Sequence, residues 1–208
     1  MMRGLICAAA RLLLGTYFFR IKGLVTEGKE NIPAEGAVII APNHKSNFDP
    51  PAIGVCSPRI IHYMAKEELF KNPVFAAVIR YFGTFPVKRG SVDRAAIRQA
   101  LAVLKSGEPL GIFPEGTRTH GNRIGRFHDG MASIALMTGT PVLPVAVLGT
   151  EHLPRREGPL AVIFGKPIPV EKQRPTPEAM QAVNDKVRAE LLRMREEYYK
   201  KAGWEPGE

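Results

Sequence analysis

The sequence predicts an α/β fold: a single domain with a mixed, mostly parallel sheet flanked by helices. Three observations support this prediction. Short apolar runs bounded by Gly or Pro have the character of buried strands. Segments with helical spacing of apolar residues alternate with them, as in sheets covered by helices. The chain has 208 residues, of which 45% are hydrophobic, so it is long enough for one domain with a sizeable core.

The N-terminal residues 1–21 are predicted to form a separate segment, an amphipathic helix that associates with a membrane. The stretch 5–19 is mostly apolar but contains Arg11, and it is shorter than the roughly 20 apolar residues that a spanning helix needs. In an interfacial helix, Arg3, Arg11 and Arg20 would reach lipid headgroups. An ordinary core helix and a cleaved secretory signal are the alternatives.

The domain proper is predicted to span residues 22–203, followed by a tail at 204–208. Its strands are predicted from apolar runs at 37–40, 60–64, 110–113, 142–148 and 160–164. A further short strand is expected just before Lys88.

Three helices are predicted between and after these strands. The first covers 91–105, with Ser91 as its N-cap. The second, 130–138, is apolar almost all round and is therefore expected to be buried. The last begins after Thr176 as N-cap with Pro177 at its first position, and its apolar residues recur at spacings of three and four.

The net charge and the cysteine content limit the kinds of partner and the compartment that are compatible with this sequence. The net charge is +9, and the last 38 residues are neutral overall, so the positive charge lies in residues 1–170. This predicts an anionic partner, which could be a membrane, a phosphorylated substrate or a nucleic acid. The two cysteines, Cys7 and Cys56, form no disulfide framework or zinc motif and favour a reducing compartment.

The first candidate site follows the first predicted buried strand, in the segment 42–51. Pro50 disfavours the α conformation at Asp49, so we expect a loop or tight turn in which His44 and Asp49 meet. A carboxylate on one imidazole nitrogen leaves the other nitrogen free to take a proton from a hydroxyl. The alternative is that Asp49 caps a helix starting at Pro50 or Pro51 and that His44 is structural.

A second and a third cluster offer positive charge and hydrogen-bond donors. The segment 113–119 again follows a predicted strand and contains a glycine turn with Thr117 and Arg118, which suits a phosphate. Lys88 and Arg89 follow another short strand. Each of these two clusters is weak evidence on its own.

Together, four blocks in this order resemble those of the glycerolipid acyltransferase family, and most closely its 1-acyl-glycerol-3-phosphate (lysophosphatidic acid) acyltransferases. The blocks are Asn-His-x-x-x-x-Asp at 43–49, Gly-x-Phe-x-x-x-Arg at 83–89, Phe-Pro-Glu-Gly-Thr-Arg at 113–118 and Val-Leu-Pro-Val at 142–145. The likeness extends from about residue 22 to 168. In the family the residue before the second-block arginine is often acidic, whereas here it is Lys88, which leaves the choice of headgroup in doubt.

The resemblance implies a glycerolipid acyltransferase-like fold and transfer of a fatty acyl group from acyl-CoA or acyl carrier protein to the free hydroxyl of a lysophospholipid. It assigns His44 as general base and Asp49 as its orienting partner. It also implies that the acceptor phosphate is bound by Lys88, Arg89, Glu115, Gly116, Thr117 and Arg118.

We expect no metal and no cofactor, because acyl transfer from a thioester needs neither and the sequence has no metal-ligand spacing. The expected partners are membrane lipids, lysophosphatidic acid and the acyl donor, at the cytoplasmic face of a membrane. Two other function classes remain open at this point: a non-catalytic protein that binds anionic lipid, and a nucleic-acid-binding domain. The latter is disfavoured because no basic stripe with interleaved aromatics is present.

Overall fold

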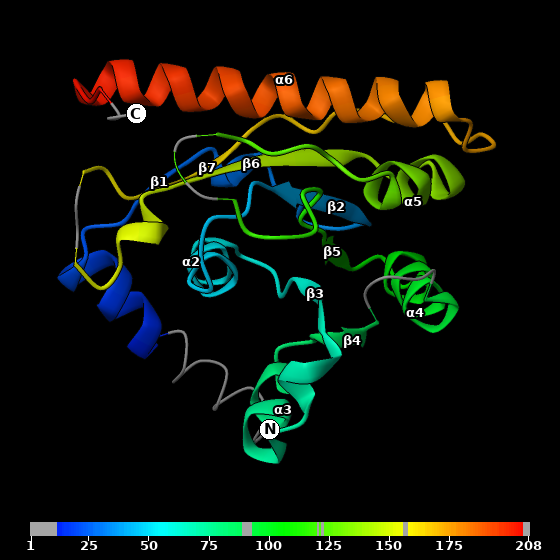
Figure 1. Ribbon diagram of the computed structural model, residues 1–208, viewed down its shortest axis with the longest axis horizontal. Coiled ribbons are helices and arrows are strands. Elements are labelled where there is room, and N and C mark those ends of the chain that lie inside the picture. The colour runs from blue at the N-terminus through cyan, green and yellow to red at the C-terminus, as the bar shows by residue number, and fades with distance from the viewer. Residues whose placement is uncertain (1–11, 89–92, 120, 122, 156–157, 206–208) are drawn as a thin grey trace.

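The strands of the protein form one sheet with helices on both faces (Figure 1). A computed structural model describes residues 12–88, 93–119, 121, 123–155 and 158–205. In this part of the chain the strand order is β1-β7-β6-β2-β5-β3-β4. The pair β6–β7 is antiparallel and the other neighbouring pairs are parallel. The predicted α/β class with a mostly parallel sheet is therefore confirmed.

The strands are β1 (Val25–Glu27), β2 (Val38–Pro42), β3 (His62–Lys66), β4 (Phe85–Val87), β5 (Pro109–Gly111), β6 (Val142–Leu148) and β7 (Ala161–Phe164). The α-helices are α2 (Asp49–Cys56), α3 (Pro73–Tyr81), α4 (Arg94–Lys105), α5 (Gly130–Thr138) and α6 (Pro177–Ala202). Shorter helical turns are η1 (Thr16–Ile21), η2 (Lys29–Asn31), η3 (Glu67–Phe70) and η4 (Thr150–His152).

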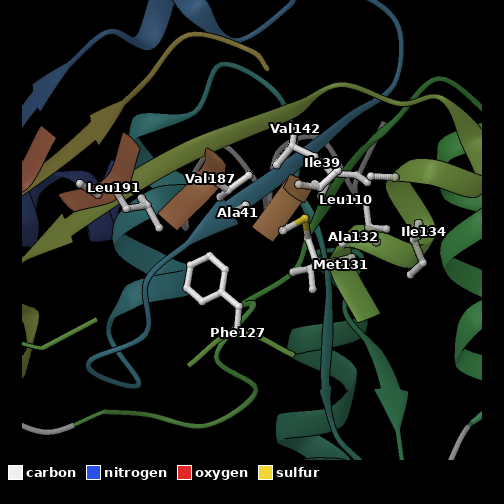
Figure 2. Packing of buried hydrophobic residues seen from close by; sticks show 14 of the residues in the cluster. Ile39, Ala41, Leu110, Phe127, Met131, Ala132, Ile134, Val142, Val187 and Leu191 are labelled. Atoms are coloured by element: carbon white, nitrogen blue, oxygen red, sulfur yellow. The ribbon is translucent and has the colours of Figure 1, made fainter. Parts of the chain in front are cut away.

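The core consists of two layers, one on each face of the sheet. Along β2, Ile39 and Ala41 join the cluster with α4, α5 and α6, whereas Val38 and Ile40 join the cluster with η1 and α2. Figure 2 shows the first cluster, in which Ile39 and Ala41 belong to the same packed group as residues of α5 and α6. Burying one such side chain stabilises the fold by about 1.5–3 kcal/mol. Because both faces of β2 are covered, the loop that follows it starts from a rigid strand.

Several predicted elements match the structure closely. The predicted ranges 130–138 and 142–148 coincide with α5 and β6. Helix α6 has Thr176 as its N-cap, and the Thr176 hydroxyl accepts a hydrogen bond from Ala179 N. Strands β2, β3 and β5 are shifted by one or two residues from the predicted ranges. Such shifts arise because apolar runs mark buried residues rather than the ladder of backbone hydrogen bonds.

Helix α4 starts later than predicted. Its N-cap is Asp93, whose carboxylate accepts hydrogen bonds from the backbone N–H groups of Ala95 and Ala96. The prediction that Ser91 caps this helix was wrong, because Asp93 supplies the side-chain acceptor two residues later. Ser91 itself lies outside the described residues.

One strand, β1, and one α-helix, α3, were not predicted at all. Strand β1 is only three residues long and lies at the edge of the sheet beside β7. Helix α3 is capped by Asn72, which accepts a hydrogen bond from Phe75 N, but Val74, Phe75 and Val78 are exposed. Its apolar residues therefore do not mark a core-facing stripe, which is the pattern on which helix prediction depends.

Only part of the predicted N-terminal segment can be compared with the structure, since residues 1–11, including Arg3 and Arg11, lie outside the described residues. Residues 12–15 are helical and continue into η1. Phe18 is fully buried in the core, whereas Leu12 and Leu13 are 70% and 72% exposed. Among the described residues, no helix is both long and apolar enough to cross a membrane.

Candidate active site

The candidate site lies where β2, β5 and β6 end. Strand β2 pairs in parallel with both β5 and β6, so their carboxyl ends meet at one edge of the sheet. The segments that follow these three strands carry, respectively, His44 with Asp49, the 113–118 block, and Thr150. Ligands of open α/β sheets bind outside the carboxyl ends of strands.

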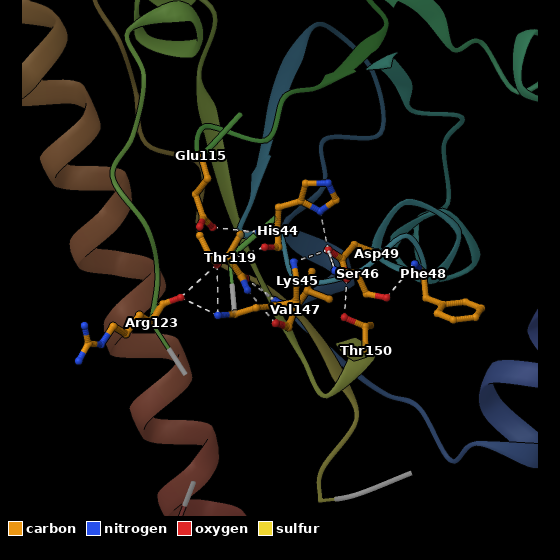
Figure 3. Close-up of polar contacts among 11 residues, drawn as sticks. His44, Lys45, Ser46, Phe48, Asp49, Glu115, Thr119, Arg123, Val147 and Thr150 are labelled. Carbon is orange, nitrogen blue, oxygen red and sulfur yellow. Dashed lines mark hydrogen bonds and ion pairs between the residues drawn. The ribbon is translucent and has the colours of Figure 1, made fainter. Parts of the chain in front are cut away.

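His44 and Asp49 form a hydrogen-bonded pair at this edge. The distance between His44 Nδ1 and Asp49 Oδ2 is 2.7 Å (Figure 3). The Asp49 side chain is fully buried, whereas that of His44 is 14% exposed. An ionised carboxylate only accepts hydrogen bonds, so Nδ1 donates; in a neutral imidazole Nε2 then keeps a lone pair. This arrangement matches an oriented general base.

The local structure around Asp49 differs from the prediction. We expected Asp49 to lie in a loop, but α2 begins at Asp49 itself, with prolines in its first turn. Prolines are tolerated there because first-turn N–H groups have no intrahelical partner. The alternative in which Asp49 is a helix cap is also wrong, because Phe48 occupies the N-cap position and makes no side-chain cap bond.

The carboxylate of Asp49 is held from two sides. Oδ2 accepts hydrogen bonds from the backbone N–H groups of Lys45, at 2.7 Å, and Ser46, at 2.9 Å, in addition to His44. Oδ1 accepts a hydrogen bond from the hydroxyl of Thr150, which is also fully buried. These donors compensate the burial of a negative charge.

An aromatic stack supports the His44 ring. The imidazole lies on Phe113 with ring centroids 4.0 Å apart and an interplanar angle of 29°, and Phe113 in turn stacks on Tyr63 at 5.8 Å. Tyr63 pairs with Gly111 across β3 and β5. A Cβ at Gly111 would lie 2.2 Å from the Tyr63 ring, so only glycine leaves room for this stack.

Glu115 connects the loop after β2 with the chain that follows β5. Its Oε1 accepts a hydrogen bond from His44 N and its Oε2 accepts one from Gly125 N, both at 2.9 Å. Glu115 is only 3% exposed. The resemblance implies a place for Glu115 in the phosphate site, which stays a prediction; in the structure its buried carboxylate holds the backbone of His44.

Lys45 and Thr119 join the same two segments a second time (Figure 3). The Lys45 ammonium donates hydrogen bonds to Gly121 O and Arg123 O, both at 2.6 Å. Burial lowers the pKa of Lys45, while nearby Glu151 and Glu115 act in the opposite direction. Thr119 N donates to His44 O at 2.9 Å. The 113–118 block is thereby fixed next to the loop that carries His44.

The other predicted phosphate ligands are placed in different ways. Thr117 and Arg118 are exposed and directly precede Thr119, so they lie beside the His44 loop. Gly116 has φ +66°, and a Cβ there would come within 2.9 Å of His128. Lys88 is exposed directly after β4. It lies at the same edge of the sheet as His44, but β5 and β3 lie between β4 and β2. The backbone N–H of Lys88 donates a hydrogen bond to the Asp93 carboxylate. Arg89 lies outside the described residues.

Sequence reasoning gave no role to Asn43 and missed Thr150, and both residues belong to the site. The Asn43 side chain bridges to β6, since its Oδ1 accepts from Val147 N at 2.7 Å and its Nδ2 donates to Val147 O at 2.9 Å. Thr150 was not singled out at all. A Gly-Thr pair directly after a strand is too common a pattern to have identified it.

No group of three or more His, Cys, Asp or Glu residues that could hold a metal ion occurs among the residues that the structure describes. The chemical groups that the structure brings together here include the His44–Asp49 pair and the cations of the neighbouring segments. Such a set can remove a proton from an alcohol and can bind an anion beside it.

Comparison with known proteins identifies the family of this chain. A family model described as Acyltransferase matches residues 23–148. The chain is 35% identical over 149 residues to a 1-acyl-sn-glycerol-3-phosphate acyltransferase of Bacillus subtilis, an alignment that covers 70% of this chain and 74% of that protein. It is also 38% identical over 106 residues to a lyso-ornithine lipid O-acyltransferase of Pseudomonas aeruginosa, covering 50% of this chain but only 40% of that protein.

The crystal structure of a 1-acyl-sn-glycerophosphate acyltransferase from Thermotoga maritima has a similar fold. Its TM-score is 0.74 at 29% sequence identity, covering 93% of this chain and 81% of that chain. The family match spans the segment from before β1 to the end of β6, which includes the candidate base His44, its partner Asp49 and the 113–118 block. The chain therefore belongs to the acyltransferase family.

Proposed function

We propose that this protein transfers a fatty acyl group from a thioester, acyl-CoA or acyl carrier protein, to the free hydroxyl of 1-acyl-glycerol-3-phosphate. The products are phosphatidic acid and the free thiol. The observation that carries this proposal is the His44–Asp49 pair, with 2.7 Å between Nδ1 and Oδ2, at the carboxyl end of β2. Relatives that share the family and are named for this reaction support it.

In the proposed mechanism each step uses named atoms of this pair. Nε2 of His44 takes the proton of the acceptor hydroxyl while the hydroxyl oxygen attacks the thioester carbonyl. Asp49 keeps Nδ1–H oriented and stabilises the imidazolium that forms. The tetrahedral intermediate then collapses, its carbon–sulfur bond breaks, and the proton on His44 passes to the departing thiolate. General-base assistance of this kind contributes roughly 10² to 10⁴ in rate.

The acceptor phosphate is proposed to bind beside this base. Thr117 and Arg118 are exposed and lie next to the His44 loop, and an arginine can bind a phosphate through two hydrogen bonds. Lys88, which follows β4, adds positive charge at the same edge of the sheet. Arg89, the next residue in the sequence, is proposed to bind the phosphate as well. Glu115 is proposed to contribute to this site by holding the loop that carries His44, because its carboxylate accepts hydrogen bonds from His44 N and Gly125 N.

We further propose that the protein works at the surface of an anionic membrane, on the cytoplasmic face. The acceptor and product are lipids. Leu12 and Leu13 present exposed apolar surface, and the exposed Arg20 follows in η1 of the same N-terminal segment. Apolar residues flanked by cations favour interfacial binding, and each cation adds about 1 kcal/mol near an anionic leaflet.

The decisive experiment measures acyl transfer on vesicles that contain the acceptor. Thiol release from acyl-CoA or acyl carrier protein should depend on 1-acyl-glycerol-3-phosphate and should be lost in His44→Ala. Arg118→Ala should chiefly raise KM for the acceptor and leave KM for the donor unchanged. Turnover by His44→Ala at the wild-type rate would remove His44 from the mechanism.

A second acceptor is included because one relative is named for another lysolipid. If lyso-ornithine lipid is acylated and 1-acyl-glycerol-3-phosphate is not, the substrate assignment fails while the reaction class stands. Sedimentation with the same vesicles completes the test. Vesicle binding without any acyl transfer would favour a non-catalytic lipid-binding protein.

A further inference from the structure

We propose that Thr150 is a positioning residue for acyl transfer, one that holds the carboxylate of Asp49 in the orientation that His44 needs. This inference rests on the proposed function and concerns the same site. Thr150 lies 101 residues from Asp49 in sequence, yet their side chains are hydrogen-bonded and both are fully buried.

The two oxygens of Asp49 have different partners. Oδ2 receives three N–H groups, all from the segment 44–46: His44 Nδ1, Lys45 N and Ser46 N. Oδ1 receives the hydroxyl of Thr150. Without this hydroxyl, Oδ1 would be a buried anionic oxygen, for which the described residues offer no other hydrogen-bond donor. A carboxylate in that state gains by rotating to share the donors of Oδ2.

Thr150 is well placed to prevent such a rotation, because it extends from a rigid element. It follows β6, whose seven residues are all buried. The turn between them requires Gly149, since φ is +76° and a Cβ would lie 2.1 Å from Pro159 O. Figure 3 shows Thr150 and His44 on different sides of the Asp49 carboxylate.

The same strand also holds the histidine loop through Asn43, whose side chain pairs with both backbone groups of Val147. The end of β6 thus fixes the base-bearing loop at one point and the carboxylate at another. The geometry points to β6 and η4 as the support of the pair, with Thr150 as the group that contacts Asp49 directly.

The test compares Thr150→Val, which removes the hydroxyl and keeps the branched shape, with Thr150→Ser, which keeps the hydroxyl. Thr150→Val should lower kcat by about 10- to 100-fold, the range for one hydrogen bond to a charged group. KM for donor and acceptor should change by less than about twofold, because no substrate contact is lost. Thr150→Ser should recover most of kcat. Thr138→Val, which removes a hydroxyl bonded to Ile134 O within α5, is the matched control and should keep wild-type kinetics.

A spectroscopic measurement separates positioning from general stability. A proton hydrogen-bonded between imidazole Nδ1 and a carboxylate gives a strongly downfield resonance in the proton NMR spectrum. This resonance, assigned by its absence in His44→Ala, should shift or broaden in Thr150→Val and return in Thr150→Ser. If Thr150→Val does not fold, Thr150→Ala replaces it with the same expectation.

Wild-type kcat in Thr150→Val, or a Thr150→Ser variant as slow as Thr150→Val, would overturn the inference. So would an unchanged downfield resonance in Thr150→Val. A wild-type protein without acyl transfer would instead count against the proposed function, and the NMR comparison would still decide whether Thr150 orients the pair.

Discussion

Replacing Asp49 by Asn tests the charge of the proposed catalytic pair while keeping the shape of the side chain. The amide oxygen can take the place of Oδ2 and accept the N–H groups of His44, Lys45 and Ser46. The amide NH₂ then faces Thr150, whose hydroxyl can accept as well as donate. We therefore expect Asp49→Asn to fold with nearly the wild-type melting temperature.

The expected loss of activity follows from the missing electrostatic attraction. With Nδ1 and Oδ2 at 2.7 Å, the centres of the two charged groups are roughly 4 Å apart. At an effective dielectric constant of about 20, their attraction is about 4 kcal/mol. If the imidazolium is fully formed in the transition state, kcat falls by about 10³-fold.

The assay is thiol release at saturating donor and acceptor, with unfolding followed in parallel. Asp185→Asn serves as the control, because Asp185 is exposed on α6 and bonds only a neighbouring Gln181 side chain in the described contacts. A folded Asp49→Asn protein with kcat within about tenfold of wild type would refute the reasoning. Asp49→Ala should also lose stability, since it leaves buried donors unpaired at about 1–3 kcal/mol each.

Two further predictions concern packing. Gly111→Ala should lower the free energy of unfolding by about 1–3 kcal/mol, because the new Cβ overlaps the Tyr63 ring. Thermal unfolding checks this, with Gly54→Ala as the control because a Cβ at Gly54 meets nothing within 4 Å. Equal stability of the two variants would contradict the packing of Tyr63 against Gly111. Burial raises the pKa of the Cys56 thiol from 9.0 to about 11. Between these pH values the native state keeps a proton that the unfolded state loses. The free energy of unfolding therefore decreases as the pH rises from 9 to about 11. In a Cys7→Ser background, alkylation of Cys56 at pH 8 should be about 100-fold slower than in the unfolded protein, and equal rates would exclude a protected thiol.

Local sequence patterns predicted the framework of the sheet well. The runs that became β6 and α5 are apolar almost throughout, as expected of elements covered on all sides. Helix α6 was predicted from its cap and its stripe of apolar residues, both of which depend only on near neighbours. Strand β1 and helix α3 could not be predicted in this way, since one is three residues long and the other exposes its apolar side chains.

The candidate site was predicted in part. His44 and Asp49 were singled out because a histidine and an aspartate close together after a buried strand suggest a base, but their spacing did not establish that they touch. The partners of Glu115 were not predictable, because Gly125 and His44 approach it only when the segments after β2 and β5 pack together.

The sequence by itself predicted His44 and Asp49 as the candidate pair and most of the strands and helices that surround it, because residue type, spacing and periodicity are local properties. Only the tertiary structure decided which groups hold those residues in place. Asp49 receives Thr150 from 101 residues away, and Asn43 reaches Val147 across 104 residues. Contacts at such separations follow from the pairing of β2 with β6 in the sheet. Local sequence patterns do not indicate which strands pair.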